Sequence, residues 1–373
     1  MDKPSGINFS CGPCSKHLGW RAPAGEYAGR SHRSEAGLAL LREVIDLQKK
    51  ILKLPAGYQL GIVDASSTGA VEILLWSLLG NRGVDVVSHC VFSKYWEHDI
   101  INELKISDTR VFREDFFKKA DVRNIDFDRD VVFCWTSTTS GTSFFNADWI
   151  KSTRSGLTIC DAASAIFAFE FDWEKLDAMA FSWQKVLGGE AGIGSIILGP
   201  RALERLDTHR PPWPIPRIFD LASCPGVFDG YTINTPSMIC VEDFRNNLRW
   251  VDDIGGQSSL CKRINNNYAA VKKWVDGQDI FRFLVEEKSR AQHIACLDIC
   301  TEFYGALSEK EKWSFLKKIV AIGEQEKVGF DFLGHILTKP HLRIWCGPTV
   351  ETSDLELFLP WLEQLYQMAL RQQ

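Results

Sequence analysis

Residues 157–189 read LTICDAASAIFAFEFDWEKLDAMAFSWQKVLGG, and this stretch indicates how the chain folds. It holds two short apolar runs, 157–162 and 178–183, which are bounded by Gly, Asp or Ser as strands are. A polar side chain follows each run: Asp161 at the exit of the first, and Lys185 just after the second. Because ligands bind beyond the carboxyl ends of parallel strands, Asp161 and Lys185 are candidate functional residues.

The same kind of apolar run recurs on both sides of this stretch. Residues 70–79, AVEILLWSLL, predict a strongly apolar helix. Strands that alternate with helical connections favour βαβ units and a sheet buried on both faces. The sequence therefore predicts an α/β fold with a mostly parallel, seven-stranded sheet flanked by helices. The five further predicted strands are LGIVDA (60–65), VDVVSHC (84–90), TRVFRE (109–114), DVVFCW (130–135) and GSIILG (194–199).

The alternation of strand-like and helix-like segments changes near residue 250, where we expect a second, smaller α/β domain to begin. Residues 253–277 predict a long helix, and Ser308 with Glu311 forms a capping box ahead of another. We therefore predict a large domain over 1–250 and a small C-terminal domain over 251–373. The last segment predicts an amphipathic helix, with one apolar stripe made of Leu355, Phe358, Leu359, Leu362, Leu365, Tyr366 and Ala369.

Composition excludes several classes of protein. The 373 residues are 45% hydrophobic and 24% charged, which is typical of a globular chain with a large core. The net charge is -5 with no block of Lys or Arg, so no nucleic-acid partner is expected. There is no long uncharged apolar run and no secretory signal pattern, so we expect neither a membrane span nor export. A soluble, cytoplasmic protein is the expectation.

The 11 cysteines are scattered through the chain, mostly inside apolar runs, and indicate reduced thiols in the cytosol. CGPC (11–14) is a Cys-x-x-Cys pair, but it has no preceding βαβ unit, so a turn is the preferred interpretation. Cys296 and Cys300 have the spacing of one helical face and are interpreted as a helical core pair. No pair of Cys or His residues has a partner pair at zinc spacing, so no metal site is predicted.

Three features of the predicted sheet together favour one cofactor. SSTGA (66–70) opens a helix, where free N–H groups and the helix dipole attract an anion such as phosphate. Asp161 supplies a carboxylate, and Lys185 an amine in a partly dry pocket. Each has an ordinary alternative: a βα turn, a helix cap and an exposed loop lysine. In combination they match pyridoxal 5′-phosphate, which needs an anion site, a carboxylate for its ring nitrogen and a Schiff-base lysine.

The chain resembles a known family along nearly its whole length. The motifs are similar to those of the class V aminotransferases of fold type I, and within that class to the phosphoserine aminotransferases. The aspartate-to-lysine block is the most specific of them. In chain order they are FSCGPCSKHLGW (9–20), GRSHRS (29–34), STGAVE (67–72), TSTTSG (136–141), DAASAIF (161–167), SWQKVLGG (182–189), NTPSM (234–238) and LRIWCGPTVE (342–351).

The resemblance implies how the cofactor is held. Lys185 would bind it covalently and Asp161 would pair with its ring nitrogen. Trp96 would stack on the ring, and Thr138 would lie near the phenolic oxygen. The residues implied for the phosphate are Ser67, Thr68 and Gln184 of one subunit, and Asn234 and Thr235 of the neighbouring subunit of a homodimer.

The resemblance also implies substrate contacts. Arg343 would grip the α-carboxylate, a task suited to a planar fork, and His32 with Arg33 would receive the distal anion. The family's common pattern has a second His-Arg pair shortly before the carboxylate arginine. Here His335 has no arginine after it, and the cations nearby are Lys339 and His341.

The implied reaction moves an amino group between L-glutamate and 3-phosphohydroxypyruvate, giving O-phospho-L-serine and 2-oxoglutarate in serine biosynthesis. Related phospho-hydroxy acids, including a pyridoxine-pathway substrate, stay open as alternatives. An alanine/serine–glyoxylate aminotransferase would leave His32 and Arg33 without a purpose. A cysteine desulfurase needs a mobile cysteine, and Cys346 lies in a strand-like run instead. A thiol-redox protein that uses Cys11 and Cys14 is the alternative from another class.

Overall fold

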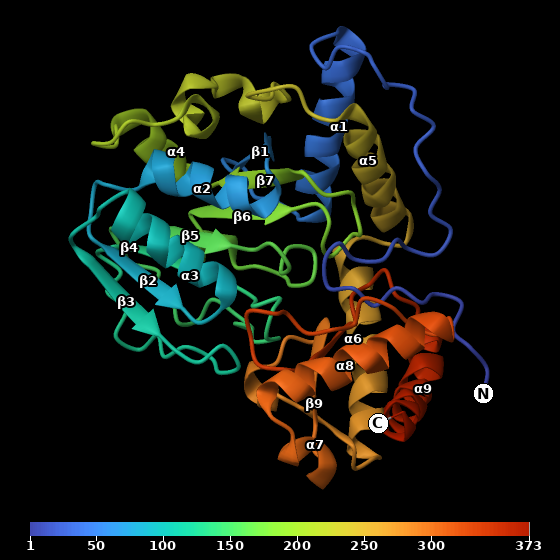
Figure 1. Ribbon diagram of the computed structural model, residues 1–373. Helices are drawn as coiled ribbons and strands as arrows, with labels where there is room; N and C mark the ends of the chain where they lie inside the picture. The colour runs from blue at the N-terminus through green and yellow to red at the C-terminus, as the bar shows by residue number, and fades with distance from the viewer. Residues whose placement is uncertain (373) are drawn as a thin grey trace.

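Seven strands form one sheet in a computed structural model that describes residues 1–372 (Figure 1). The strand order across the sheet is β1-β7-β6-β5-β4-β2-β3. Each of the seven strands predicted from the sequence is present. Their bounds are β1 Gln59–Asp64, β2 Val84–Ser88, β3 Thr109–Arg113, β4 Asp130–Cys134, β5 Thr158–Asp161, β6 Ala178–Ser182 and β7 Ile193–Leu198.

The sheet is mostly parallel, as predicted. Strands β2 to β6 pair in parallel, whereas β7 runs antiparallel to both β1 and β6. The exception has a physical cause: only residues 183–192 connect β6 to β7, too few for the helical crossover that a parallel pair needs. This short reversal carries Lys185 at the carboxyl edge of the sheet.

Both faces of the sheet are buried, because alternate residues of one strand enter different apolar clusters. In β4, Val132 and Cys134 join the cluster under α2 and α3, while Val131 and Phe133 join the other. Figure 1 shows α1 packed beside α5, so two helices that are far apart in the sequence lie side by side. The helices of this part are α1 Glu35–Ile51, α2 Ser66–Leu78, α3 Val91–His98 followed by a π turn Asp99–Glu103, α4 Pro200–Thr208 and α5 Met238–Asp253.

The C-terminal part has its own antiparallel sheet, in the order β10-β9-β8, beneath α8 and α9 in Figure 1. The capping box of Ser308 and Glu311 is confirmed at the start of α8, and the predicted apolar stripe is buried in α9. The elements are α6 Gln257–Asp276, β8 Phe281–Phe283, β9 Ile294–Ile299, α7 Glu302–Ala306, α8 Glu309–Gln325, β10 Leu342–Trp345 and α9 Thr352–Arg371.

The division of the chain near residue 250 stays a prediction. The N-terminal segment also contacts the C-terminal part: Phe9 N–H donates to the Phe330 carbonyl at 3.4 Å, and Trp345 N–H to the Phe9 carbonyl at 3.0 Å. The first residues therefore lie against the C-terminal part, with Phe9 beside β10, before the chain crosses to the large sheet. No helix within residues 1–372 combines the length and apolarity that a bilayer crossing needs.

One local prediction was wrong. Cys296 lies in strand β9, and Cys300 follows its end, so the two do not share a helix. The run 294–299 is apolar at nearly every position because β9 is the central strand of its sheet, between β8 and β10. Over so short a stretch, apolarity on all sides does not distinguish a buried strand from a buried helix.

Candidate active site

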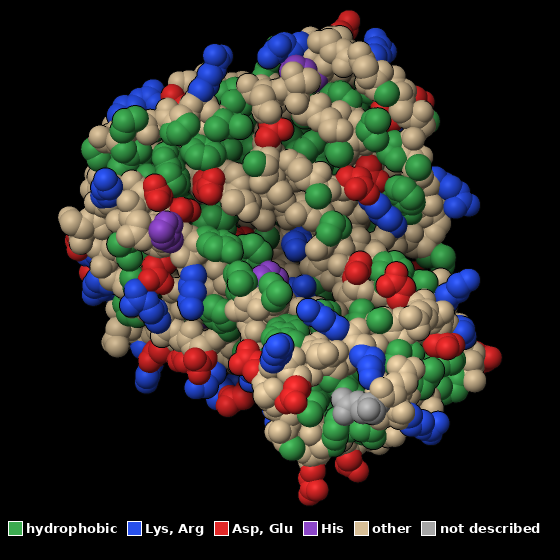
Figure 2. All heavy atoms as spheres, in the orientation of Figure 1, with side chains coloured by type: hydrophobic (Ala, Val, Ile, Leu, Met, Phe, Trp, Pro, Cys, Tyr) green, Lys and Arg blue, Asp and Glu red, His purple; other side chains and the backbone are tan. Residues whose placement is uncertain are grey.

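The carboxyl edge of the large sheet brings Asp161 and Lys185 together. Asp161 is the last residue of β5, and Lys185 lies in the turn after the neighbouring strand β6. Their charges are close enough to affect each other's pKa. Figure 2 shows a hollow on this face of the molecule between the large sheet and the C-terminal helices, with Lys or Arg and His side chains inside it.

The Asp161 carboxylate is buried, with 6% of the residue exposed, and three groups donate to it. Oδ1 accepts from Ala163 N–H at 3.0 Å, and Oδ2 accepts from Trp96 Nε1–H at 3.0 Å and from Cys134 Sγ–H at 3.5 Å. Burial raises the pKa of Asp161, and these donors with Lys185 oppose the rise. Residues 162–172 contain no α-helix, so Asp161 is not the helix cap that was its ordinary alternative.

The Lys185 amine lies under the N-terminal segment. Its Nζ donates to the Cys11 carbonyl at 3.1 Å, and Cys14 N–H donates to the Gln184 carbonyl at 2.9 Å. A Cβ on Gly12 would lie 2.0 Å from Lys185 Nζ, so only glycine lets the segment pass so close. Burial is the main cause that lowers the pKa of Lys185, which favours a neutral, nucleophilic amine.

CGPC therefore borders the lysine, and both of its thiols are buried. Burial raises the pKa of both Cys11 and Cys14, although Lys185 and Arg343 act in the opposite direction. A reactive cysteine needs a depressed thiol pKa and access to solvent. Both side chains are buried, so the geometry does not favour the thiol-redox alternative.

Replacing Cys11 and Cys14 together with serine tests that alternative. We expect the steady-state transamination rate to stay within about fivefold of the unmodified protein, because serine keeps the shape and leaves the backbone contacts intact. A thiol-redox protein would lose its activity in this variant.

The start of α2 forms the candidate phosphate cradle. Ser66 and Gln184 exchange hydrogen bonds of 2.9 and 2.6 Å, and Ser67 and Thr68 follow in the first turn, where helix N–H groups lack helical partners. Ala65 and Ser66 have φ of 62° and 58°, strained for residues other than glycine. A Cβ on Gly194 would come within 2.7 Å of the Ser66 carbonyl, so β7 packs tightly beneath this turn.

Trp96 and Thr138 follow two other strands of the sheet, β2 and β4. Trp96 is buried on α3 and donates to Asp161 as described. Thr138 follows β4, and its hydroxyl donates to Ser164 Oγ at 2.7 Å. The Thr138 carbonyl accepts from Arg343 Nη1 at 2.8 Å, so this loop links the large sheet to β10.

Arg343 extends from β10 toward the same edge. Its Nε is buried and has no hydrogen-bond partner within residues 1–372, so one side of the guanidinium fork is free for a ligand. His335 lies near enough to Arg343 and Lys185 for both to lower its pKa, although burial has the larger effect. Arg343 is therefore the permanent cation on this side of the site, with His335 and Lys185 beside it.

Lys339 and His341 do not take the place of the missing arginine. His341 is fully buried, with Nδ1 2.8 Å from the Lys339 carbonyl, and burial lowers its pKa to about 4, so it is neutral at pH 7. Lys339 Nζ lies 4.6 Å from the centre of the Phe117 ring. Neither supplies the charge that an arginine after His335 would have supplied.

Four predicted residues lie apart from this cluster. His32 and Arg33 precede α1, and Asn234 and Thr235 precede α5. Within the described chain, no hydrogen bond or ion pair joins them to Lys185, Asp161 or Arg343. Arg33, Asn234 and Thr235 are exposed, whereas His32 is 4% exposed with an unpartnered Nε2.

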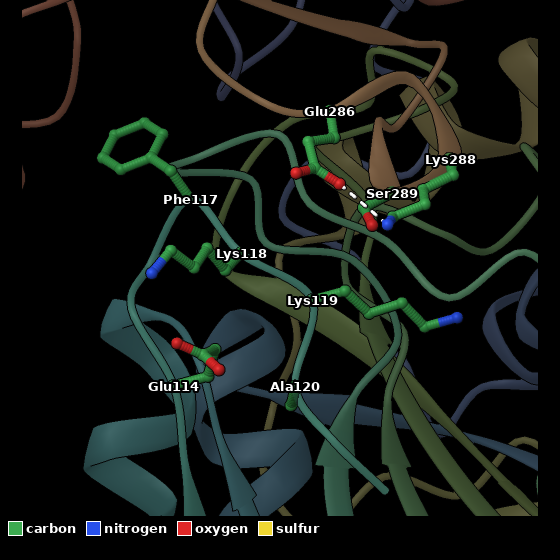
Figure 3. A pocket seen from close by; sticks show the side chains of 8 residues that line it. All are labelled: Glu114, Phe117, Lys118, Lys119, Ala120, Glu286, Lys288 and Ser289. Carbon is green, nitrogen blue, oxygen red and sulfur yellow. Dashed lines mark ion pairs between the residues drawn. The ribbon is translucent and has the colours of Figure 1, made fainter.

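A separate pocket of about 570 Å³ lies between residues 114–120 and 286–289 (Figure 3). The amines of Lys118 and Lys119 point to opposite sides in Figure 3, and Lys288 is paired with Glu286 at 3.0 Å. The pocket thus has no converging cations, and it contains none of the predicted site residues. In residues 1–372, no three His, Cys, Asp or Glu side chains gather as metal ligands would.

The residues at the sheet edge fit pyridoxal phosphate. The buried carboxylate suits a protonated ring nitrogen, the buried amine suits an aldehyde, and the free first turn of α2 suits a phosphate. Sequence reasoning missed Ser66, Cys134, Ser164 and the Cys11 carbonyl. Ser66, Ser164 and Cys11 lie inside the motifs SSTGA, DAASAIF and FSCGPCSKHLGW, whereas Cys134 lies in a predicted strand and carried no functional signal.

Comparisons with known proteins agree with this geometry. The family model for class V aminotransferases matches residues 118–299. A phosphoserine aminotransferase of Methanosarcina mazei is 44% identical over 98% of this chain and 98% of its own. A solved phosphoserine aminotransferase from Cytophaga hutchinsonii superposes with a TM-score of 0.78 at 21% identity, covering 98% of this chain and 99% of the other.

A pyridoxal-phosphate-bound phosphoserine aminotransferase from Trichomonas vaginalis superposes with a TM-score of 0.76 at 16% identity, over 95% of this chain and 99% of the other. At such low identity the two solved structures show the common fold alone. The family model and the 44% identical relative together define a pyridoxal-phosphate-dependent aminotransferase of class V. The chain belongs to the phosphoserine aminotransferase family, because it is 44% identical to the Methanosarcina mazei relative over 98% of its length.

Proposed function

We propose that this protein transfers an amino group between L-glutamate and 3-phosphohydroxypyruvate, giving O-phospho-L-serine and 2-oxoglutarate, as a step of serine biosynthesis. The observation that carries the proposal is the partly buried Lys185 amine, which lies close enough to Asp161 and Arg343 for both charges to act on its pKa. The 44% identity to a relative of that name supports the choice of substrates.

Asp161 and the start of α2 would hold the cofactor. When bound, pyridoxal phosphate supplies an electron sink for the bond electrons released at the substrate Cα. Asp161 would keep a proton on the ring nitrogen, which its negative charge favours. Ser67 and Thr68 would bind the phosphate, with the Ser66–Gln184 pair fixing the turn. Trp96 would cover the ring and Thr138 would lie at its phenolic oxygen.

Lys185 would act as the base. Because burial lowers its pKa, Nζ is more readily neutral and able to take the proton from the substrate Cα. The Cys11 carbonyl would hold the amine in place when it is not covalently engaged, since it already accepts from Nζ at 3.1 Å.

Arg343 would bind the α-carboxylate. Nη1 is occupied by the Thr138 carbonyl at 2.8 Å, which fixes the plane of the guanidinium group. The buried, unpartnered Nε is left for the substrate, and a carboxylate is the acceptor best matched to that fork.

His32 and Arg33 would receive the distal anion. Glutamate and phosphoserine differ beyond Cβ, but both end in an anion, so one cationic site serves both. The basic groups near His335 in the same chain are Arg343 and Lys185. Both already have other roles, so neither is left to bind the distal anion. We therefore assign the distal charge to Arg33, with His335 as a helper.

Replacing Arg33 with alanine should lower kcat/KM for both substrates by about 10- to 100-fold, since one hydrogen-bonded charge is lost from each. The absorbance spectrum of the bound cofactor should not change. Arg30→Ala, an exposed arginine three residues earlier, is the matched control and should behave like the unmodified protein. Loss for only one of the two substrates would refute a shared site.

We further propose a two-fold homodimer with two composite sites. Asn234 and Thr235 are exposed just ahead of α5 and make no described contact with the α2 cradle of their own chain. In a symmetric dimer, they would complete the phosphate cradle of the other subunit.

Mixing two inactive variants tests this arrangement. One carries Lys185→Ala and the other carries Asn234→Ala with Thr235→Ala. In a mixed dimer one site carries both lesions and the other is intact, so random exchange should restore about a quarter of full activity. Zero activity after proven exchange, or an active monomer, would contradict composite sites.

Product analysis tests the proposed reaction itself. The full-length holoprotein is incubated with L-glutamate and 3-phosphohydroxypyruvate, and phosphoserine and 2-oxoglutarate are quantified. Glyoxylate, with alanine or serine as donor, tests the main rival in the class. Faster turnover with glyoxylate than with 3-phosphohydroxypyruvate would contradict the proposed substrates.

The cytoplasm remains the proposed location. All 11 cysteines are free thiols, and seven of them are buried, an arrangement that suits a reducing compartment. Mass spectrometry of the protein from its native cells should find these thiols unpaired.

A further inference from the structure

Two fully buried thiols lie behind the Asp161 carboxylate. Cys134 ends β4 and is the direct register partner of Asp161 on β5, so both side chains emerge on the same face of the sheet. Its Sγ lies 3.5 Å from Asp161 Oδ2. Cys90, at the start of α3, lies close enough to Cys134 for each thiol to affect the pKa of the other.

The orientation of the thiol protons follows from their neighbours. Cys90 Sγ accepts from Ser93 N–H at 3.3 Å, which fixes that sulfur at the first turn of α3. Cys134 has one proton and two possible acceptors, the Asp161 carboxylate and the Cys90 sulfur. An ionised oxygen is the stronger acceptor, so the Cys134 proton goes to the Asp161 carboxylate.

Oδ2 is therefore held from two sides, by the Trp96 indole N–H at 3.0 Å and by the Cys134 thiol. Oδ1 has only the Ala163 N–H at 3.0 Å. The two donors on Oδ2 fix the plane of the carboxylate, because its rotation would break both. Oδ1, with a single described donor, is then the oxygen with a lone pair left for a ligand.

We propose that Cys134 is a positioning residue that aims the Asp161 carboxylate at the ring nitrogen of pyridoxal phosphate. This inference rests on the proposed function of Asp161 and deepens it. It gives one of the 11 cysteines a purpose beyond packing. Cys160 next to Asp161 lacks this purpose, since it belongs to the apolar cluster on the opposite face.

The test compares two cofactors that differ only at the ring nitrogen. Full-length protein freed of cofactor is titrated with pyridoxal phosphate and with the analogue that has carbon in place of that nitrogen. For Cys134→Ala we expect the dissociation constant for pyridoxal phosphate to rise about 3- to 10-fold, as for one lost hydrogen bond. Affinity for the carbon analogue should stay the same, since Asp161 has no partner there.

Two further variants separate positioning from packing. Cys134→Ser keeps a donor and should restore pyridoxal phosphate affinity to within about twofold. Cys160→Ala removes an equally buried thiol beside Asp161 and should change neither affinity. If Cys134→Ala does not fold, Cys134→Val replaces it, because valine fills the space without a donor.

The inference is overturned if the alanine or valine variant binds pyridoxal phosphate normally, if both cofactors weaken equally, or if serine fails to rescue. None of these outcomes affects the proposed reaction, which is tested by its products. Conversely, a protein that makes no phosphoserine but shows the cofactor-selective loss would contradict the substrates and leave Cys134 in its role.

Discussion

Lys185→Ala should lower kcat by at least about 10³-fold, the largest effect expected for any single substitution in this protein. The variant loses both the covalent attachment and the base at the substrate Cα. It should still bind pyridoxal phosphate, because Asp161 and the start of α2 are unchanged. The measurement is turnover at saturating cofactor, with cofactor binding followed separately by absorbance.

Lys119→Ala is a matched control for that result. Burial also lowers the pKa of Lys119, but its Nζ lies 5.3 Å from the centre of the Phe144 ring, and it lines the separate pocket of Figure 3. Its removal should leave turnover unchanged. Reduction of the holoprotein with borohydride should fix the cofactor on the peptide that contains Lys185, and a label on any other lysine would refute the assignment.

Asp161→Asn should lower kcat by about 10²- to 10³-fold at saturating cofactor, as expected when one charged partner of the reacting group is lost. An amide cannot hold the pyridinium proton by charge. In the variant, both terminal positions of the new amide would face a hydrogen-bond donor: Ala163 N–H at the position of Oδ1 and Trp96 Nε1–H at the position of Oδ2. The amide nitrogen therefore faces a donor in either orientation, which should cost about 1–3 kcal/mol of stability.

Thermal unfolding distinguishes the two effects of this substitution. A small drop in Tm with a large drop in kcat supports Asp161 as the partner of the ring nitrogen. If the variant stays near full activity, Asp161 has no part in the chemistry and serves only to hold the turn at Ala163.

Much of the fold could be predicted because it depends on local patterns. Each strand of the large sheet is a short apolar run with polar ends, and burial on both faces makes such runs distinct from their helical connections. The capping box at Ser308 and the stripe in α9 are likewise local. Cys296 was misjudged because the central strand β9 is as apolar as a buried helix would be.

The candidate site was less predictable, since its contacts join residues far apart in the chain. Asp161 and Lys185 were found because each follows a strand at the edge where ligands bind. The Cys11 carbonyl is 174 positions from Lys185, and Cys134 is 27 positions from Asp161, and neither local sequence indicates such a contact. Arg33, Asn234 and Thr235 are exposed and have no described hydrogen bond to Lys185, Asp161 or Arg343, so their roles stay proposals.

The most direct test of the account is a set of half-reactions on the full-length holoprotein. O-phospho-L-serine, L-glutamate, L-alanine and L-cysteine are added one at a time, and the cofactor absorbance is followed without any acceptor. We expect phosphoserine and glutamate to convert the aldehyde form to the amine form at least about 10²-fold faster than alanine or cysteine, because only they carry a distal anion for Arg33. Faster conversion by alanine or cysteine, with no response to phosphoserine, would contradict the account.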